Sequence, residues 1–330
     1  MYPLVSICVP VYGVENYIER CCRSLFEQTY PNIEYIFVND CTPDNSIDIL
    51  ERILLEYPTR VNNIRIYSHQ VNRGLAGARN TAVEAASGVY LMHVDSDDYL
   101  DLNVVECLVN TALSENADVV QYDMRYVFSD KQYIVHQQIP ASKIECVKNV
   151  LNFKMSGCVC GALYDVNLFH RSGVHFIEGL NFGEDYVTKP RILYYARKIV
   201  HCKECFYNYV QYNTSSYTLS YKQKNIDDLI EAISVLKKFF SSKQDYEIYK
   251  DDVELAHLYV KIKLLLAICL HRKDVWNNVS RVADLYTDKN PYIACLPLSY
   301  KLVLKLAHYK LYNLMYVYVN CGYWLKKIVK

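Results

Sequence analysis

Two aspartates separated by one residue, Asp95 and Asp97, directly follow the apolar run of residues 89–94. Carboxylates at the end of a strand can bind a hard divalent cation such as Mg²⁺ or Mn²⁺. Such a cation takes one or two protein carboxylates and fills other positions with substrate phosphates. Aspartate is also a common turn and capping residue, so the pair could instead form a solvated turn before a helix near Asp101. The pair alone leaves both interpretations open.

Two further polar groups could contact a nucleotide. Asp40 also follows an apolar run and could accept a hydrogen bond from a nucleobase, whereas Thr42 and Asp44 are better explained as caps of the next helix. Arg79 belongs to the polar group of residues 72–80, and its guanidinium would suit a diphosphate or a base. The alternative for Arg79 is an ion pair on the surface.

A second pair of carboxylates, Glu184 and Asp185, lies far downstream between Phe182 and Tyr186. A carboxyl group flanked by aromatic side chains could have a raised pKa and act as a general base. The alternative is a solvated turn that carries two charges, and the residues by themselves favour that alternative.

The segments that must position these residues alternate between apolar runs and helical patterns over the first 125 residues. The predicted strands are residues 5–9, 34–38, 64–67, 89–94 and 117–122. The predicted helices are residues 14–27, 44–56, 75–86 and 102–114. This alternation predicts an α/β fold with a mainly parallel sheet covered by helices on both faces. Ligands bind such sheets beyond the carboxyl ends of the strands, where Tyr12, Asp40, Asp95 and Asp97 collect.

The rest of the chain predicts a second, helical region. Residues 126–222 are less regular, and helical spacing returns in residues 226–240, 253–270 and 300–318. We therefore predict a catalytic domain over residues 1–222 and a helical C-terminal region over residues 223–330. Lys261 and Lys263 interrupt the longest apolar run, so we expect no transmembrane helix. The apolar run of residues 4–9 is too short for the core of a signal peptide.

Composition excludes several classes of protein. Lys+Arg and Asp+Glu are balanced at 36 each, which argues against a nucleic-acid binder because such proteins carry a basic excess. The 13 cysteines lack the spacing of a disulfide framework. Cys202 and Cys205 are separated by two residues, but no second pair completes a zinc site, so we interpret them as structural. Buried free thiols suit a reducing cytoplasm, which is the location that we predict.

Five segments, in chain order, resemble family-2 glycosyltransferases of the GT-A fold. Val9-Pro10-Val11-Tyr12 is similar to that family's opening motif, and residues 38–44 resemble its Asp-Asp-Gly-Ser-Thr-Asp segment. Residues 72–80 resemble its Asn-Gly-Gly-Leu-Ser-Ala-Ala-Arg-Asn segment. Val94-Asp95-Ser96-Asp97-Asp98-Tyr99-Leu100 matches its metal motif without change, and residues 182–185 match its catalytic-base segment. The resemblance covers about residues 3–220.

The resemblance implies an inverting glycosyltransferase that moves a sugar from a nucleotide-diphosphate donor, a UDP-sugar, to a hydroxyl group of a glycan or lipid-linked acceptor. It implies a role in cell-surface polysaccharide synthesis. Asp97 would bind Mg²⁺ or Mn²⁺, Asp95 would contact the ribose or support the metal, and Asp185 would be the general base. The remaining donor-binding residues that it implies are Pro10, Tyr12, Asp40, Asn72 and Arg79.

The sequence departs from the family pattern in four places. Gly13 stands where Asn is usual, and Asn39 replaces the first Asp of the usual pair. Cys41-Thr42 replace the Gly-Ser that follows that pair, and Arg73 replaces the first Gly of Gly-Gly. The change at Arg73 is expected to alter contacts to the sugar.

Two other functions were weighed against the glycosyltransferase. A nucleotidyltransferase would be expected to carry a Gly-rich loop with a Lys after the first strand, but Tyr12-Gly13-Val14-Glu15 holds one Gly and no Lys. A non-catalytic sugar-nucleotide-binding protein would not need Asp95, Asp97 and Asp185 together.

The C-terminal tail is basic and rich in apolar residues. From Lys289 to Lys330 there are seven Lys and no Asp or Glu. Leu302, Leu306 and Leu314 are among the apolar positions of the helical pattern. A basic, apolar helix favours contact with an anionic membrane surface, near a lipid-linked acceptor. The alternative is that these apolar residues pack on the catalytic domain.

Overall fold

The computed structural model describes residues 2–213, 222–285 and 290–328, and the chain forms two compact units, residues 1–215 and 216–330. The side chains of residues 205, 206, 274 and 323–328 lie outside the description as well. The boundary predicted between residues 222 and 223 therefore stays a prediction, because residues 214–221 are not described. The structural role predicted for Cys202 and Cys205 also stays a prediction.

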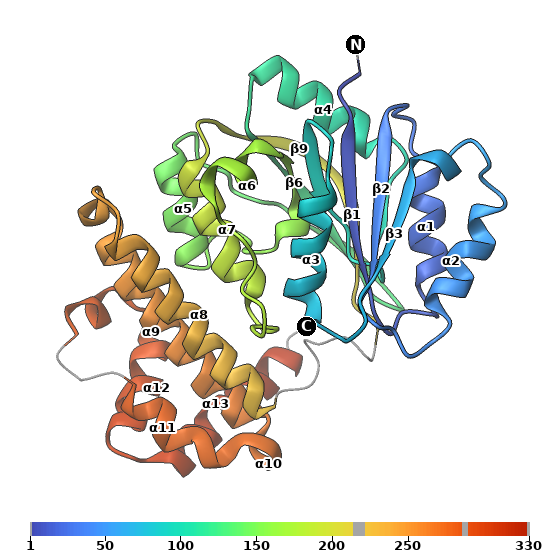
Figure 1. Cartoon of the computed structure of the whole chain (residues 1–330). Helices are drawn as coiled ribbons and strands as arrows, with labels where there is room; N and C mark the ends of the chain where they lie inside the picture. The colour runs from blue at the N-terminus through green and yellow to red at the C-terminus, as the bar shows by residue number, and fades with distance from the viewer. Residues whose placement is uncertain (1, 214–221, 286–289, 329–330) are drawn as a thin grey trace. The chain divides into compact units, whose positions relative to one another are not determined.

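The first unit is built on one twisted sheet of nine strands (Figure 1). Their order is β3-β2-β1-β4-β8-β6-β9-β5, with β7 paired to β6 on the side. Four parallel strands form the first half: β1 (Val5–Val11), β2 (Ile33–Asn39), β3 (Ile64–Ser68) and β4 (Tyr90–His93). The second half contains β5 (Tyr99–Leu100), β6 (Val119–Val127), β7 (Gln132–Val135), β8 (Ala162–Asp165) and β9 (Ile199–Val210). The prediction of a mainly parallel α/β sheet is confirmed.

One antiparallel strand interrupts the parallel order. β8 pairs antiparallel with both β4 and β6, so β6 runs in the same direction as β4 without touching it. β9 then pairs parallel with β6, and the short β5 pairs antiparallel with β9. The five predicted strands are all present; the sequence pattern did not reveal that β8 lies between the last two of them.

Helices cover both faces of the parallel half. In Figure 1, α1 (Ile18–Phe26) and α2 (Ser46–Leu54) lie on one side of β1–β3, and α3 (Gly74–Ala85) lies on the other. All seven residues of β1 are buried, because a central parallel strand packs against helices on both faces. The remaining helices of this unit are α4 (Val104–Glu115), α5 (Lys143–Leu151), α6 (Asn167–Ser172) and α7 (Glu184–Tyr195).

The register of the central strands sets the edge where the polar residues lie. Val11 pairs with Asn39 across β1 and β2, and Cys8 pairs with His93 across β1 and β4. Tyr12, Asp40 and the loop that begins at Val94 therefore leave the sheet on the same edge. This is the position at which parallel sheets bind ligands.

Helix α1 begins at Ile18, four residues later than predicted. The backbone N–H groups of residues 13–15 instead bind side chains of the loop after β2 and of the first residue of α2. Gly13 donates to Thr42 Oγ1 at 2.8 Å, Val14 to Ser46 Oγ at 3.2 Å, and Glu15 to Asp44 Oδ2 at 2.9 Å. Thr42 and Asp44 therefore tie the first two strand-end loops together. The capping role predicted for them is wrong, because Asn45 is the N-cap residue of α2 and no side chain caps the helix there.

The second unit is helical. Its helices are α8 (Gln223–Ser241), α9 (Tyr246–Leu270), α10 (Arg272–Val275), α11 (Val279–Asp284), α12 (Leu298–His308) and α13 (Tyr312–Ile328). The predicted helices 226–240 and 253–270 are confirmed within α8 and α9. Among the described residues, no helix is both long enough and apolar enough to cross a bilayer.

The single helix predicted over residues 300–318 is wrong, because two helices meet there. Lys310 takes a left-handed backbone conformation with φ 55°. The N–H of Leu311 bonds to the carbonyl of Leu306 at 2.9 Å, and that of Lys310 bonds to Ala307 at 3.0 Å. These two bonds form a Schellman motif, which ends α12. Apolar spacing continues through the break, which is why the sequence pattern did not reveal it.

Candidate active site

Four ionisable side chains meet in the interior of the first unit, around Arg79 of α3. Its Nη2 lies 2.9 Å from Asp95 Oδ1, and its Nη1 lies 2.9 Å from Glu184 Oε1 and also contacts Asp185 Oδ1. The Arg79 side chain is only 1 % exposed. The alternative of a surface ion pair is therefore wrong, and no exposed part of this guanidinium is left to contact a diphosphate directly.

Local sequence explains how three distant segments reach Arg79. Helix α3 buries small residues, Ala76, Gly77, Ala78 and Ala82, which let it approach the sheet closely. Asp95 follows β4, whereas Glu184 and Asp185 form the first turn of α7. Acidic side chains are favourable there, since the helix N-terminus carries a partial positive charge. The solvated turn considered for Glu184 and Asp185 is wrong, because Glu184 is buried and the Asp185 side chain is 19 % exposed.

The charges of this cluster do not balance, because one guanidinium faces three carboxylates. Burial, together with the charge of Asp185, raises the pKa of Glu184 to about 8. Burial also raises the pKa of Asp185, although Arg79 opposes the shift. At neutral pH Glu184 therefore holds a proton. A pair of carboxyl groups whose environments separate their pKa values can divide the roles of acid and base.

Asp97 lies in the same loop as Asp95, and its carboxylate accepts a hydrogen bond from Asn213 Nδ2 at 2.8 Å. Burial, with a further contribution from the Asp95 carboxylate, raises the pKa of Asp97. Among the described residues, no group of three or more His, Cys, Asp or Glu side chains is arranged to hold a metal ion. Two neighbouring carboxylates nevertheless fit Mg²⁺ or Mn²⁺, which bind proteins through one or two carboxylates and substrate phosphates.

The loop of Asp95 and Asp97 is not a solvated turn. Asp98 is 1 % exposed, and its carboxylate accepts hydrogen bonds from Tyr207 Oη at 2.7 Å and from the Val210 N–H at 2.8 Å. The same Tyr207 oxygen accepts the Asp95 N–H at 3.0 Å. The next helix begins at Val104, so neither aspartate caps it. Asp98 and Tyr207 thus fix the loop; the run of acidic residues pointed to Asp98, but nothing in the sequence pointed to Tyr207.

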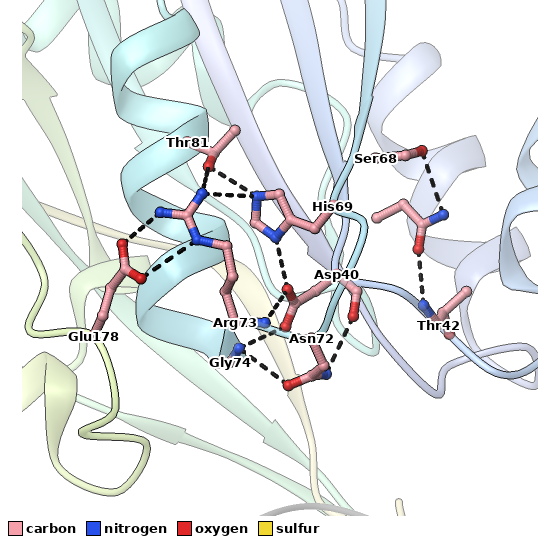
Figure 2. A network of polar contacts seen from close by, with 10 residues as sticks. Asp40, Thr42, Ser68, His69, Asn72, Arg73, Gly74, Thr81 and Glu178 are labelled. Carbon is pink, nitrogen blue, oxygen red and sulfur yellow. Dashed lines mark hydrogen bonds and ion pairs between the residues drawn. The ribbon is translucent and has the colours of Figure 1, made fainter.

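Asp40 organises the loop between β3 and α3 (Figure 2). Its Oδ1 lies 2.7 Å from His69 Nδ1 and accepts the Arg73 N–H at 2.8 Å, and its Oδ2 accepts the Gly74 N–H at 2.8 Å. Asn72 Nδ2 donates to the Asp40 carbonyl at 3.1 Å. The Asp40 side chain is 4 % exposed, and these three donors use most of the roughly four acceptor positions of its carboxylate. No sequence pattern marks His69.

The other residues predicted to bind the donor base differ in exposure. Tyr12 is 51 % exposed just beyond the end of β1, so its ring is available to a ligand at this edge of the sheet. Pro10 is buried within β1, where it pairs with Val38 of β2. The structure therefore brings Tyr12, Asp40 and Asn72 to one edge but gives Pro10 no exposed surface there.

Arg73 connects this loop to the segment that precedes α7. Its guanidinium forms an ion pair with Glu178, with Nε 3.4 Å from Oε2 (Figure 2). Nearby, Asn80 Nδ2 donates to the Phe176 carbonyl and the Phe176 N–H donates to Asn80 Oδ1, both at 2.9 Å. These contacts fix the segment before α7 against α3, and thereby the position of Asp185.

The sheet order and the carboxylates at its edge are those expected of a glycosyltransferase of the GT-A class. The chain belongs to glycosyl transferase family 2, whose model matches residues 6–173. Glu184 and Asp185 lie beyond the matched residues. The chain is 32 % identical over 274 residues to EpsJ, an uncharacterised glycosyltransferase of Bacillus subtilis, and the match covers 81 % of this chain and 78 % of EpsJ.

Two solved structures show the same fold. Residues 1–349 of S. aureus TarS, in complex with UDP-GlcNAc, superpose with a TM-score of 0.73 at 18 % identity, covering 96 % of this chain and 90 % of that one. A mannosyltransferase of Pyrobaculum calidifontis, in complex with GDP-Man and Mn²⁺, gives a TM-score of 0.57 at 16 % identity, covering 97 % and 85 %. The GT-A fold expected from the sequence is confirmed.

The raised pKa of Glu184 predicts a pH-dependent stability. An unfolded glutamate loses its proton near pH 4.5, whereas folded Glu184 keeps it to about pH 8. Between these values the folded state binds more protons, so the free energy of unfolding falls as the pH rises. Glu184→Gln cannot ionise and should lose this part of the slope, which amounts to at most about 1.4 kcal/mol per pH unit.

Chemical denaturation at a series of pH values across this window measures the effect. Glu178→Gln is the matched control, because Glu178 is 46 % exposed and lies just before the same helix. Equal slopes for Glu184→Gln and the unsubstituted protein would show that Glu184 ionises normally.

Proposed function

We propose that this chain transfers a sugar from a UDP-sugar to a hydroxyl group of a glycan or lipid-linked acceptor, with inversion at the anomeric carbon, in cell-surface polysaccharide synthesis. The observation that carries the proposal is the Arg79 cluster. A single buried guanidinium joins Asp95, in the metal motif, to Asp185, which follows it by 90 residues. The Arg79 cluster thus brings Asp95, which is suited to the donor side, close to Asp185, which is suited to the acceptor side.

Each side of the cluster supplies one part of the reaction. Asp185 takes the proton from the acceptor hydroxyl as that oxygen attacks the anomeric carbon. The carbon–oxygen bond to the diphosphate breaks on the opposite face, so one displacement inverts the anomeric configuration. Asp97, supported by Asp95, would hold Mg²⁺ or Mn²⁺, and such an ion neutralises negative charge on the departing diphosphate. Complexes of two structural relatives, with UDP-GlcNAc and with GDP-Man and Mn²⁺, support a nucleotide-sugar donor and a divalent cation.

The donor base would bind at the sheet edge formed by Tyr12, Asp40 and Asn72. Tyr12 offers an exposed ring for contact with the base, and Asp40, whose side chain is 4 % exposed, holds the backbone of the adjoining loop through the Arg73 and Gly74 N–H groups. The complex of TarS with UDP-GlcNAc supports uridine as the base, whereas the mannosyltransferase, with the lower TM-score, is in complex with GDP-Man.

Donor binding should require a divalent metal and Asp97. Calorimetry should show that Mn²⁺ strengthens UDP binding to the unsubstituted protein, because the metal offsets repulsion between the diphosphate and the carboxylates. Asp97→Asn should lose this strengthening, whereas Asp48→Asn, which changes an exposed aspartate of α2, should keep it. Equal UDP affinity in Mn²⁺ and in EDTA would contradict the metal site. Tighter binding of guanosine or thymidine diphosphate would contradict the choice of uridine.

Removing the general base Asp185 should prevent sugar transfer without weakening donor binding. Asp185→Asn should lower the transfer rate by about 10²- to 10⁴-fold, the usual contribution of a general base. UDP affinity should not change, since the base acts on the acceptor. Glu184→Gln is the matched control, because the neighbouring residue is already protonated at neutral pH and should retain transfer. If Glu184→Gln abolished transfer while Asp185→Asn did not, the two roles would have to be exchanged.

We also propose that the second unit contacts an anionic membrane surface on its cytoplasmic side. Leu298, Leu302 and Tyr309 recur at helical spacing along α12 and are 83 %, 38 % and 60 % exposed. Lys305 occupies the same stripe. In α13, Leu314 and Val317 are 57 % and 54 % exposed. Exposed apolar side chains with interspersed Lys suit the boundary between lipid headgroups and acyl chains.

Co-sedimentation with vesicles that contain anionic lipid tests this contact. Lys305→Glu combined with Lys310→Glu should weaken binding, since each basic residue near an anionic surface contributes about 1 kcal/mol. Lys198→Glu is the control, because Lys198 is exposed in the first unit and paired to Glu115. If the double variant and the unsubstituted protein bind equally at low salt, the apolar residues serve another purpose, such as packing on the catalytic unit.

A further inference from the structure

One buried cation of the first unit has no part in the chemistry described so far. Lys189 is 1 % exposed and lies on α7, four residues after Asp185, so both side chains project from the same face of the helix. Its Nζ donates to Gln121 Oε1 at 3.0 Å and to the carbonyl of Cys158 at 2.7 Å.

The peptide group that Lys189 contacts also contacts Asp185. The carbonyl of Cys158 and the N–H of Val159 belong to the same peptide group. The carbonyl accepts from Lys189, and the N–H donates to Asp185 Oδ2 at 3.1 Å. The ammonium at one end of this peptide dipole and the carboxylate at the other both stabilise its orientation. The arrangement is therefore a continuous chain from Lys189 through one peptide group to Asp185.

The segment that carries this peptide group is held on several sides. Ser156 Oγ accepts the Cys158 N–H at 3.2 Å, Tyr164 Oη donates to the Val159 carbonyl at 3.2 Å, and Tyr122 Oη donates to the Cys160 carbonyl. These side chains leave the peptide group little freedom to rotate, so it transmits the position of Lys189 to Asp185.

Ionisable groups surround both ends of this chain, Lys189 and Asp185. Burial lowers the pKa of Lys189 to about 8, opposed by Asp185 and by the thiols of Cys158, Cys160 and Cys146. At neutral pH the ammonium is therefore mainly protonated. Around Asp185, the guanidinium of Arg79 favours the ionised form, and the Asp95 and Glu184 carboxyl groups face the same cluster.

We propose that Lys189 is a positioning residue for the base Asp185, acting through the peptide group between Cys158 and Val159. It fixes the direction of Oδ2, and its charge strengthens the N–H bond that stabilises the ionised carboxylate. Arg79 holds the other oxygen, Oδ1. Both carboxylate oxygens of Asp185 are therefore held in position. Arg79 contacts Oδ1 directly, and Lys189 acts on Oδ2 through the peptide group. The inference rests on the proposed role of Asp185 as the base.

The pH dependence of transfer tests the proposal. In Lys189→Met the peptide N–H bond is weaker, Asp185 ionises less readily, and the acidic limb of kcat/KM moves to higher pH. We expect a shift of about half to one pH unit, which is about a three- to tenfold loss on the acidic side. Above about pH 8, where Lys189 itself loses its proton, the variant and the unsubstituted protein should converge. Lys189→Arg should restore the limb, and Lys198→Met, a change of an exposed lysine, should not move it.

A loss of the same size at every pH in Lys189→Met would show a merely structural role and overturn the proposal. Transfer that survives in Asp185→Asn would instead overturn the proposed base, so the two failures are distinguishable. A measurement on the unsubstituted protein covers the case in which Lys189→Met does not fold. With ¹⁵N-valine labelling, the Val159 amide resonance should shift with an inflection near pH 8 both in the unsubstituted protein and in Glu184→Gln, where the titration of Glu184 cannot contribute. A Val159 resonance that does not respond to pH in that range would also overturn the proposal.

Discussion

The buried ion pairs of Arg79 are the interaction on which the rest of the site depends. Moving a guanidinium and carboxylates out of water is unfavourable by several kcal/mol per ion, and the loss is recovered only when every group is well paired. Arg79 meets three carboxyl groups from two segments, and removing it would leave buried anions without a cation. Helix α3, the loop after β4 and the start of α7 are therefore held together by charge as well as by apolar packing.

The excess of carboxyl groups over cations in that cluster also gives two adjacent residues, Glu184 and Asp185, different protonation states. One guanidinium cannot neutralise three carboxylates, so the most deeply buried carboxyl group, that of Glu184, keeps its proton. Its neighbour Asp185 is more exposed and receives a second hydrogen bond from the Val159 N–H. Both residues accept from Arg79, but burial keeps Glu184 protonated and the added hydrogen bond leaves Asp185 able to take a proton. The division follows from position on the helix, since both residues carry the same functional group.

Much of the fold could be predicted from the sequence because its signals are local. Apolar runs gave the strands, helical spacing gave the helices, and the positions of Asp40, Asp95 and Asp97 at strand ends followed from the parallel order. The burial of Arg79 could not be predicted, because its partners Glu184 and Asp185 are 105 and 106 residues away in the chain. The antiparallel β8 and the break at Lys310 were missed for a related reason: strand pairing and backbone conformation leave no trace in apolar spacing. His69, Tyr207 and Lys189 act by hydrogen bonds across the fold, and no motif marks them.

Two of the departures from the family pattern, Arg73 and Asn39, leave a hydrogen bond of a backbone N–H group in place. At Arg73, the contact to Asp40 is made by the main-chain N–H, which a glycine would supply equally well. The side chain is then available for another purpose, and it pairs with Glu178. Both partners are about half exposed, so the pair contributes at most about 1 kcal/mol to stability. The main consequence of this ion pair is therefore geometric, because it adds a side-chain contact between the loop before α3 and the segment before α7. The change at Asn39 also keeps a hydrogen bond. Asn39 Oδ1 accepts the Thr42 N–H at 2.9 Å, as an aspartate oxygen would. Substitutions that preserve such hydrogen bonds change the side chains near the proposed donor site without disturbing the loops that we propose to bind the nucleotide.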